Sequence, residues 1–203
     1  MKSPIPLFAL ILAGIAVIAL TRPSAESAAV ATASSGGAVV AEHALAAAAN
    51  PITEEEVLAA QAAWGEAVVA IGAAKSAGKN FIEVAEAGLD ELYAYDDLPV
   101  LFKPTLAAQD QFRGTEAEAL SYFVRGVIDE DKGFALQPWT TVRFENTGIV
   151  LTGPMAVAMG NYYFTKPSGD EVKVEYSFGY IRGEDGGLKI ALHHSSLPYQ
   201  PES

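Results

Sequence analysis

The 203-residue sequence contains no cysteine and only three histidines. The lack of cysteine excludes disulfides, thiol nucleophiles and Cys-ligated zinc sites. Basic residues are also few: 13 lysines and arginines stand against 25 aspartates and glutamates, which gives a formal net charge of -12. Because nucleic-acid binding depends on clustered basic side chains, nucleic acid is not an expected partner.

The sequence also lacks the motifs of several common enzyme classes. No Gly-x-Ser-x-Gly elbow surrounds Ser195 or Ser196, so neither serine is supported as a hydrolase nucleophile. No glycine-rich phosphate loop and no dinucleotide fingerprint is found. Half of the residues are hydrophobic, which is enough for one globular domain with a substantial core.

The N-terminus predicts export. Lys2 precedes an apolar run from Ile5 to Leu20, which is somewhat shorter than the ~20 residues of a spanning helix and fits a secretory signal peptide. We expect a periplasmic or extracellular protein. The alternatives are a membrane anchor that is not cleaved and, in a eukaryote, transfer to the lumen of an organelle.

Three parts of the chain follow from this composition. Residues 1–25 are predicted to be the signal peptide or anchor, and residues 26–50, which are rich in Ala and Ser, a linker. Residues 51–203 are predicted to form the folded domain.

Within the predicted domain, helices come first and strands follow. A capping box at Thr53 and Glu56 predicts a helix with one buried stripe that ends near residues 77–78. Further helices are predicted over residues 80–93 and 115–126, with a short strand between them over residues 98–105. Strands rich in β-branched and aromatic residues are then predicted over residues 140–144, 148–151, 155–165, 171–182 and 188–196. This order is typical of an α+β fold, here a cone in which a curved antiparallel sheet wraps around the long N-terminal helix and encloses a pocket.

The last predicted strand changes chemistry along its length. Residues two apart on a strand share a face, and one face carries an apolar row of Leu188, Ile190 and Leu192. The same alternation continues this row with His194 and Ser196, as in a pocket whose floor is core and whose mouth is reactive. It predicts that His193 and Ser195 face away.

The two adjacent histidines argue against a metal site. Neighbouring residues on a strand point to opposite faces, so His193 and His194 cannot both bind one ion without a bulge. A catalytic zinc normally takes three protein ligands. We therefore predict a site without metal and without another cofactor.

Several separated motifs resemble the iota class of carbonic anhydrases, over about residues 51–201. They are Phe102–Ala107, Gln111–Arg113, Ala119–Phe123, Pro138–Thr140, Gly160–Phe164 and His193–Pro198. More distantly, the chain is similar to the association domain of calcium/calmodulin-dependent protein kinase II and to SnoaL-like cone folds. Some members of the iota class carry three histidines before the paired serines, whereas this chain has Leu192 in the first of those places. The resemblance implies reversible hydration of carbon dioxide to bicarbonate.

The resemblance also implies the residues that do this chemistry. It places a hydroxyl cluster on Thr105, Tyr122 and the second serine of the pair, Ser196, which would hold both water and the developing bicarbonate. His194, with an ordinary pKa of about 6.5, is expected to carry a proton near neutral pH. Tyr176 is a secondary candidate for substrate binding. Taken singly, Tyr122 and His194 would each fit a packing role, and only their occurrence inside the motifs favours a site.

Two alternatives to the hydration of carbon dioxide stay open. One is a non-catalytic oligomeric binding module like the kinase association domain. The other is a small-ligand isomerase or hydrolase, whose general base would be Glu145 or Glu175 if either faces the pocket. Gln111 and Arg113 fit the mouth of a pocket or an exposed pair equally well. A sheet with one exposed face commonly pairs, so we expect a homodimer.

Overall fold

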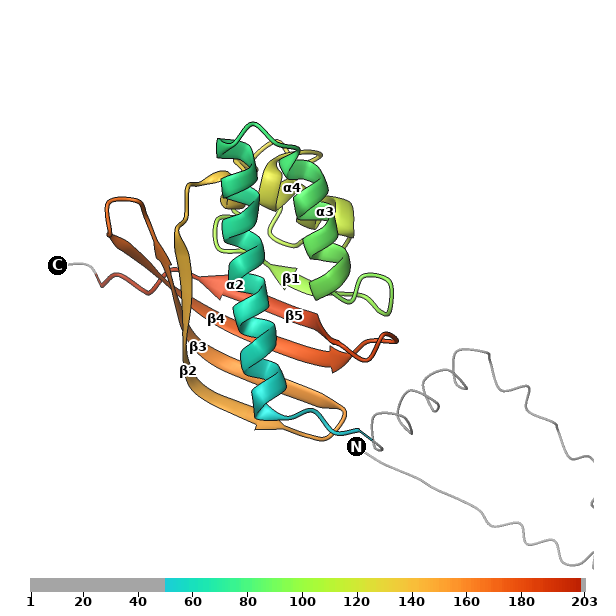
Figure 1. The fold of residues 1–203 in the computed structure, drawn as a ribbon. Coiled ribbons are helices and arrows are strands. Elements are labelled where there is room, and N and C mark those ends of the chain that lie inside the picture. Colours follow the sequence, from blue (N-terminus) through green and yellow to red (C-terminus); the bar gives the residue numbers. More distant parts are fainter. Residues whose placement is uncertain (1–49, 202–203) are drawn as a thin grey trace, which may run out of the picture.

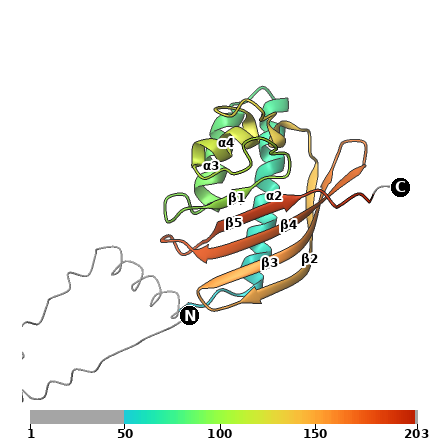
Figure 2. The same cartoon turned by 180° about the vertical axis from the view of Figure 1, so that it is seen from behind.

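The computed structural model describes residues 50–201, which form three α-helices, a short 3-10 helix and a five-stranded sheet (Figure 1). The helices lie together on one face of the curved sheet, as predicted for an α+β cone. Figure 2 shows the opposite face of the sheet, which no described helix covers. The predicted signal peptide and nearly all of the predicted linker lie outside the described residues.

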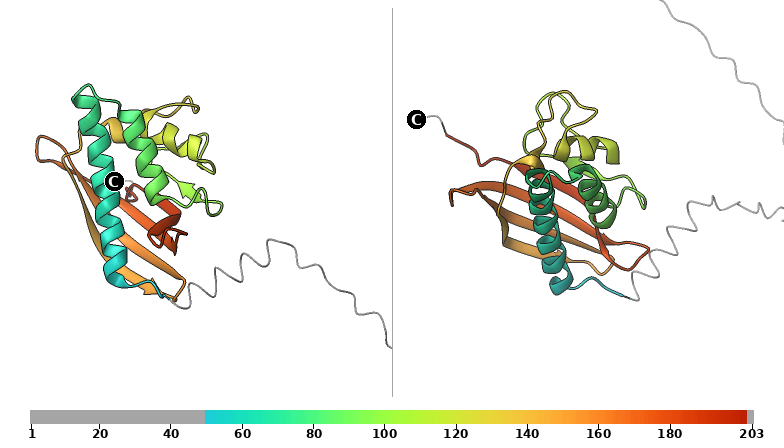
Figure 3. Two further views of the ribbon diagram at one scale, coloured as in Figure 1. Left: turned by 45° about the vertical axis from the view of Figure 1, so that its right-hand side comes forward. Right: turned by 45° about the horizontal axis from the view of Figure 1, so that its top comes forward.

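The long helix α2, Glu54–Ser76, confirms the predicted N-terminal helix. Thr53 is its N-cap and makes the capping box with Glu56. By length and composition α2 could cross a membrane, but nearly half of its apolar window is buried in the protein. Its buried stripe includes Val57, Trp64 and Val68. Figure 3 shows α2 running across the strands, so that this stripe packs on the concave face of the sheet.

The smaller elements complete the layer that covers the sheet. The helices α3, Phe81–Leu92, and α4, Glu116–Val124, confirm the predicted second and third helices. The predicted strand between them is shortened to β1, Leu101–Lys103, and ends where Pro104 removes a backbone donor. A 3-10 helix, Phe134–Leu136, was not predicted.

The sheet has the order β1-β5-β4-β3-β2, with β2 Thr141–Leu151, β3 Met155–Thr165, β4 Glu171–Arg182 and β5 Leu188–Ser196. The strands β2 to β5 form an antiparallel meander. These strands confirm the predicted antiparallel meander, and the short strand β1, whose pairing was not predicted, joins the edge of the sheet in parallel with β5. This parallel pair brings the chain after β1 alongside the end of β5.

Two β-bulges interrupt the alternation of the strands. In β2, Thr147 has no partner in β3, so the two strands predicted over residues 140–144 and 148–151 form one bulged strand. In β5, Ile190 pairs with Tyr180 and Leu192 with Gly179, which leaves Ala191 as the extra residue. A bulge adds one residue to one strand and reverses which side chains face inward beyond it. Even-numbered residues of β5 therefore face the core before the bulge, and odd-numbered residues face it after the bulge.

Candidate active site

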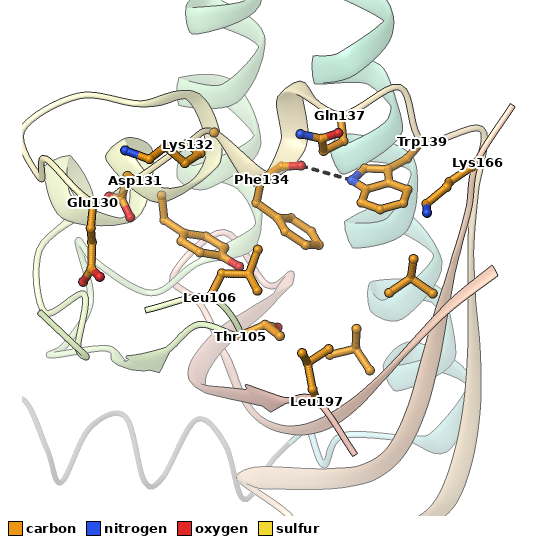
Figure 4. A pocket seen from close by; sticks show the side chains of 14 residues that line it. Thr105, Leu106, Glu130, Asp131, Lys132, Phe134, Gln137, Trp139, Lys166 and Leu197 are labelled. Atoms are coloured by element: carbon orange, nitrogen blue, oxygen red, sulfur yellow. Dashed lines mark hydrogen bonds between the residues drawn. The ribbon is translucent and has the colours of Figure 1, made fainter. Parts of the chain in front are cut away.

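A cavity of about 290 Å³ opens at one end of the cone, between the concave face of the sheet and the loops around α4. Figure 4 shows Thr105 and Leu197 on one side of it and Phe134 and Trp139 on the other. Further residues that line the cavity are Leu106, Tyr122, Glu130, Asp131, Lys132, Gln137, Lys166, Val172 and Val174.

A pair of hydroxyl groups lies beside this cavity. The register of the parallel pair places Lys103 opposite His194, so Thr105 arrives beside the end of β5. The Thr105 hydroxyl donates to Oγ of Ser195 at 3.0 Å. Ser195 is buried, whereas Thr105 is partly exposed and lines the cavity. Ser195 accepts this hydrogen bond, and its hydroxyl also interacts with that of the buried Tyr162.

Two buried tyrosines add their hydroxyls to the Thr105–Ser195 pair. Tyr122, on α4, lines the cavity, and its hydroxyl makes no hydrogen bond with any described residue. Burial raises the pKa of Tyr122, an effect that the nearby Leu106 backbone and Thr105 hydroxyl offset in part. Burial likewise raises the pKa of Tyr162, and the hydroxyls of Ser195 and Thr105 partly offset it. Both phenols therefore keep their protons at neutral pH and can act as donors.

Behind Ser195, His193 is held in a buried chain of hydrogen bonds. Trp64 Nε1 donates to the Tyr93 hydroxyl at 2.9 Å, and this hydroxyl lies 2.8 Å from Nδ1 of His193. An indole can only donate, so the Tyr93 oxygen accepts from Trp64; we assign the Tyr93 proton to His193 Nδ1, which places the imidazole proton on Nε2, a buried atom without a partner among the described residues. Burial lowers the pKa of His193 well below its ordinary value, and the neighbouring His194 adds to this effect. His193 is thus a neutral, fixed imidazole.

Comparison with known proteins decides the family. A family model described as metal-independent carbonic anhydrase matches residues 55–197. The chain belongs to the metal-independent carbonic anhydrase family. A metal-independent carbonic anhydrase from Nostoc sp. strain PCC 7120 is 47% identical over 154 residues, which cover 73% of this chain and 75% of that protein.

A solved structure agrees with this family assignment. The crystal structure of the iota-carbonic anhydrase from a cyanobacterium, complexed with bicarbonate, matches with 44% identity and a TM-score of 0.72. The match covers 74% of this chain and 95% of that chain. A putative calcium/calmodulin dependent protein kinase II association domain from Xanthomonas campestris matches with 24% identity and a TM-score of 0.42, over 66% of this chain and 83% of that one.

In this member of the metal-independent carbonic anhydrase family, the predicted orientation of the histidine and serine pairs is wrong. His193 and Ser195 face the core, and the exposed His194 and the partly exposed Ser196 lie on the outer face of the sheet. Ser196 donates there to a Glu175 carboxylate oxygen at 2.9 Å. The physical reason is the bulge at Ala191, which shifts the alternation by one residue.

The other predicted site residues divide between the cavity and the core. Thr105 and Tyr122 reach the same cavity. Tyr176 does not line it: its hydroxyl contacts Gln61 and Asn146 instead, and burial raises its pKa to about 12. Tyr176 and His194 both border a separate hollow on the outer face of the sheet.

The two carboxylates on the cavity wall are engaged by other groups. Glu130 accepts hydrogen bonds from the backbone N–H groups of Ala108, Gln109 and Asp110, which hold its pKa below the ordinary value. Asp131 forms a buried ion pair with Arg113 at 2.6 Å. Arg113 is therefore neither part of an exposed pair nor at the mouth of the pocket. These contacts fasten the loop after β1 to the loop after α4. Within residues 50–201, no group of three or more His, Asp or Glu side chains is arranged to hold a metal ion.

Sequence reasoning missed Ser195, Tyr162 and the chain formed by Trp64, Tyr93 and His193. A signal for Ser195 existed: Gly179, in the interior of the neighbouring strand, is a residue type that often marks a bulge. A Cβ at Gly179 would lie 3.1 Å from Cβ of Leu192, next to the bulged Ala191. Nothing in the sequence signals the long-range contact between Tyr93 and His193.

Proposed function

We propose that this chain catalyses the reversible hydration of carbon dioxide to bicarbonate and a proton, with Thr105, Ser195 and Tyr122 as the groups that hold water and the developing bicarbonate. The observation that carries the proposal is the Thr105–Ser195 hydroxyl pair beside the cavity to which Tyr122 also comes. The family assignment and the relative that binds bicarbonate support it.

The hydroxyl groups suit the charge that develops in this reaction. The oxygen of a water molecule forms a bond to the carbon of carbon dioxide, and negative charge moves onto the carbon dioxide oxygens. The Tyr122 hydroxyl lines the cavity and makes no hydrogen bond with any described residue, so it can donate to these oxygens, and the Thr105–Ser195 pair lies beside the same cavity. In many enzymes, fixed hydrogen-bond donors directed at the developing charge make the largest single contribution to stabilising the transition state. The proton released from water leaves to solvent through the open end of the cavity.

The side chains around the cavity favour a reaction without a metal. The two C-terminal histidines lie on opposite faces of β5, and His193 Nδ1 is already engaged by Tyr93. The carboxylates of Glu130 and Asp131 are held by backbone amides and by Arg113. These groups therefore do not converge as the three ligands of a catalytic zinc.

A carbon dioxide hydration assay on purified, chelator-treated protein tests the proposal. We expect Thr105→Val and Ser195→Ala to lower kcat by about a hundredfold, as the loss of one oxyanion donor commonly does. Ser196→Ala and His194→Gln are matched controls, because both side chains lie on the outer face, and we expect near wild-type rates. Full activity in Thr105→Val and Ser195→Ala would contradict the site, and an inactive wild type would contradict the function.

The structure weakens the isomerase alternative. That chemistry needs a carboxylate base inside the pocket, whereas the side chains of Glu145 and Glu175 are exposed. Glu175 borders the hollow on the outer face, where it accepts from Ser196. A non-catalytic binding module is the alternative that an inactive wild type would favour.

We further propose that a second copy of the chain covers the outer face of the sheet. Exposed apolar side chains gather on β2 and β3 of this face, namely Val150, Met155, Val157 and Met159. A two-fold dimer would place the same apolar patch on both sides of the contact and remove it from water. Sedimentation velocity of the purified protein checks this expectation.

Export of the protein is also a proposal. It rests on Lys2 and the apolar run from Ile5 to Leu20, which fit a signal peptide or a membrane anchor. Mass spectrometry of the protein recovered from cell fractions distinguishes a cleaved signal, a membrane-anchored chain and an uncleaved soluble form.

A further inference from the structure

The cavity is larger than bicarbonate requires. It has a volume of about 290 Å³, whereas one water molecule occupies about 30 Å³ in the liquid. Bicarbonate has only four heavy atoms. A volume close to about 300 Å³ is instead at the lower end of the range for organic ligands.

The excess volume is apolar and has a fixed wall. The ring of Tyr122 stacks on Phe134 with centroids 5.5 Å apart, and Phe134 lies 5.8 Å from Trp139. The Trp139 indole donates to the Phe134 carbonyl oxygen at 3.0 Å, which fixes its orientation (Figure 4). Leu197 lies on the opposite side of the cavity. Phe134, Trp139 and Leu197 together form an apolar sleeve that leads away from the Thr105 hydroxyl.

The charges around the sleeve allow an anion to enter a chain that is acidic overall. The exposed Lys166 lies beside Trp139 (Figure 4), and Lys132 also borders the cavity. Of the two carboxylates on the wall, Asp131 is neutralised by Arg113. Glu130 keeps its charge but turns its oxygens to three backbone amides.

We propose that this cavity also binds small monocarboxylates with an unbranched apolar tail. The carboxylate takes the place of bicarbonate and accepts from the Tyr122 hydroxyl, a placement that rests on the proposed function. The tail lies in the sleeve along Phe134 and Trp139. Such acids therefore exclude bicarbonate and inhibit the enzyme in competition with it.

A homologous series of probes tests the sleeve. Acetate, butanoate and hexanoate are titrated into the full chain, with hexan-1-ol as a probe that has a tail but no carboxylate. Affinity is expected to rise by up to about fourfold for each methylene that is buried, and hexan-1-ol is expected to bind more weakly than hexanoate. Equal affinities for acetate and hexanoate, or equal affinities for hexanoate and hexan-1-ol, would overturn the proposal.

Binding is measured by fluorescence, independently of activity. The chain has two tryptophans, of which Trp139 lines the cavity and Trp64 is buried in the core. The hexanoate signal should therefore disappear in Trp139→Phe, while isothermal calorimetry still detects binding. Loss of the signal with binding retained supports the site, and an unchanged signal in Trp139→Phe contradicts it.

Two leucine variants distinguish binding in the sleeve from nonspecific binding to exposed apolar side chains. Leu197 lines the cavity and is 54% exposed, so Leu197→Ser should fold and should lower the ratio of hexanoate to acetate affinity severalfold. Leu101 is 66% exposed but does not line the cavity, and Leu101→Ser should keep the wild-type ratio. Equal changes in both variants would contradict the site.

Kinetics distinguish this proposal from the proposed function. If the chain hydrates carbon dioxide but hexanoate binds no more tightly than acetate, the sleeve proposal fails and the function stands. If hexanoate binds through Trp139 and Leu197 but the wild type is inactive, the function fails and the sleeve stands.

Discussion

At the scale of single residues, the Tyr93 hydroxyl connects the core to the site. It accepts from the Trp64 indole and donates to His193, whose neighbour on the same face is Ser195. The His193 ring also stacks on Phe102 with centroids 4.4 Å apart, and Phe102 is three residues before Thr105. The orientation of one imidazole is therefore tied to β5, which carries Ser195, and to β1, which leads to Thr105.

Tyr93→Phe tests this positioning role. The substitution leaves two buried polar groups without partners, the Trp64 indole N–H and His193 Nδ1, and we expect a loss of about 1–3 kcal/mol of stability. It also removes the donor that keeps the proton on Nε2, so ¹⁵N NMR of the imidazole should show a mixture of tautomers. A purely structural role would leave the tautomer unchanged.

Tyr95→Phe is the matched control for Tyr93→Phe. Tyr95 stacks on Tyr93 with centroids 5.9 Å apart, and its hydroxyl donates to the Arg113 carbonyl oxygen. This variant loses the same atom from a neighbouring ring, but His193 should keep its single tautomer. An identical NMR change in both variants would show that Tyr93 does not set the tautomer.

At the scale of elements, the bulges decide which residues form the site. The bounds predicted for the last three strands match β3, β4 and β5, because turn residues and β-branched runs mark strand ends locally. The face that each residue occupies depends on pairing with the next strand, which local sequence does not encode. Both bulges lie opposite a strand glycine, Thr147 near Gly160 and Ala191 near Gly179.

Gly160→Ala tests whether the bulge in β2 depends on its glycine. A Cβ at this position would lie 2.1 Å from the Glu145 carbonyl oxygen and 2.8 Å from the Thr147 backbone nitrogen. Backbone atoms cannot move aside as the end of a side chain can, so we expect a loss of about 1–3 kcal/mol by urea unfolding. Gly148→Ala is the control, because a Cβ added at Gly148 would have no other group within 4 Å. Equal stability of the two variants would contradict this account.

At the scale of the whole molecule, the fold was more predictable than the site. Capping boxes mark where helices begin, and helical stripes and alternating strands follow from the burial of one face of each element. These local patterns together predict the α+β cone. Thr105 and Tyr122 could be singled out only through the family motifs. Their meeting with Ser195 depends on the parallel β1–β5 pair and on the Ala191 bulge, which are both long-range features.

The buried neutral His193 links the stability of the whole fold to pH. Its pKa in the folded protein lies well below the ordinary value of 6.5, so below about pH 6.5 the unfolded chain binds a proton that the folded protein does not. Stability is therefore complete above pH 6.5 and should fall as the pH decreases below it, by about 1.4 kcal/mol per pH unit. Urea unfolding at pH values from 8 to 5 measures this slope.

Variants of the two neighbouring histidines show which of them causes the loss of stability at low pH. Glu56 and Glu130, whose pKa values are lowered from 4.5, contribute stability above about pH 4.5 and lose it only at lower pH, so they do not obscure the window from pH 6.5 to 5. His194→Gln should retain the slope, since this variant leaves the buried His193 in place. His193→Gln should be less stable at pH 8 but should have a flatter profile down to pH 5, because the group that binds the extra proton on unfolding is gone. A wild-type profile that is already flat, or an unchanged slope in His193→Gln, would show that His193 is not buried in its neutral form.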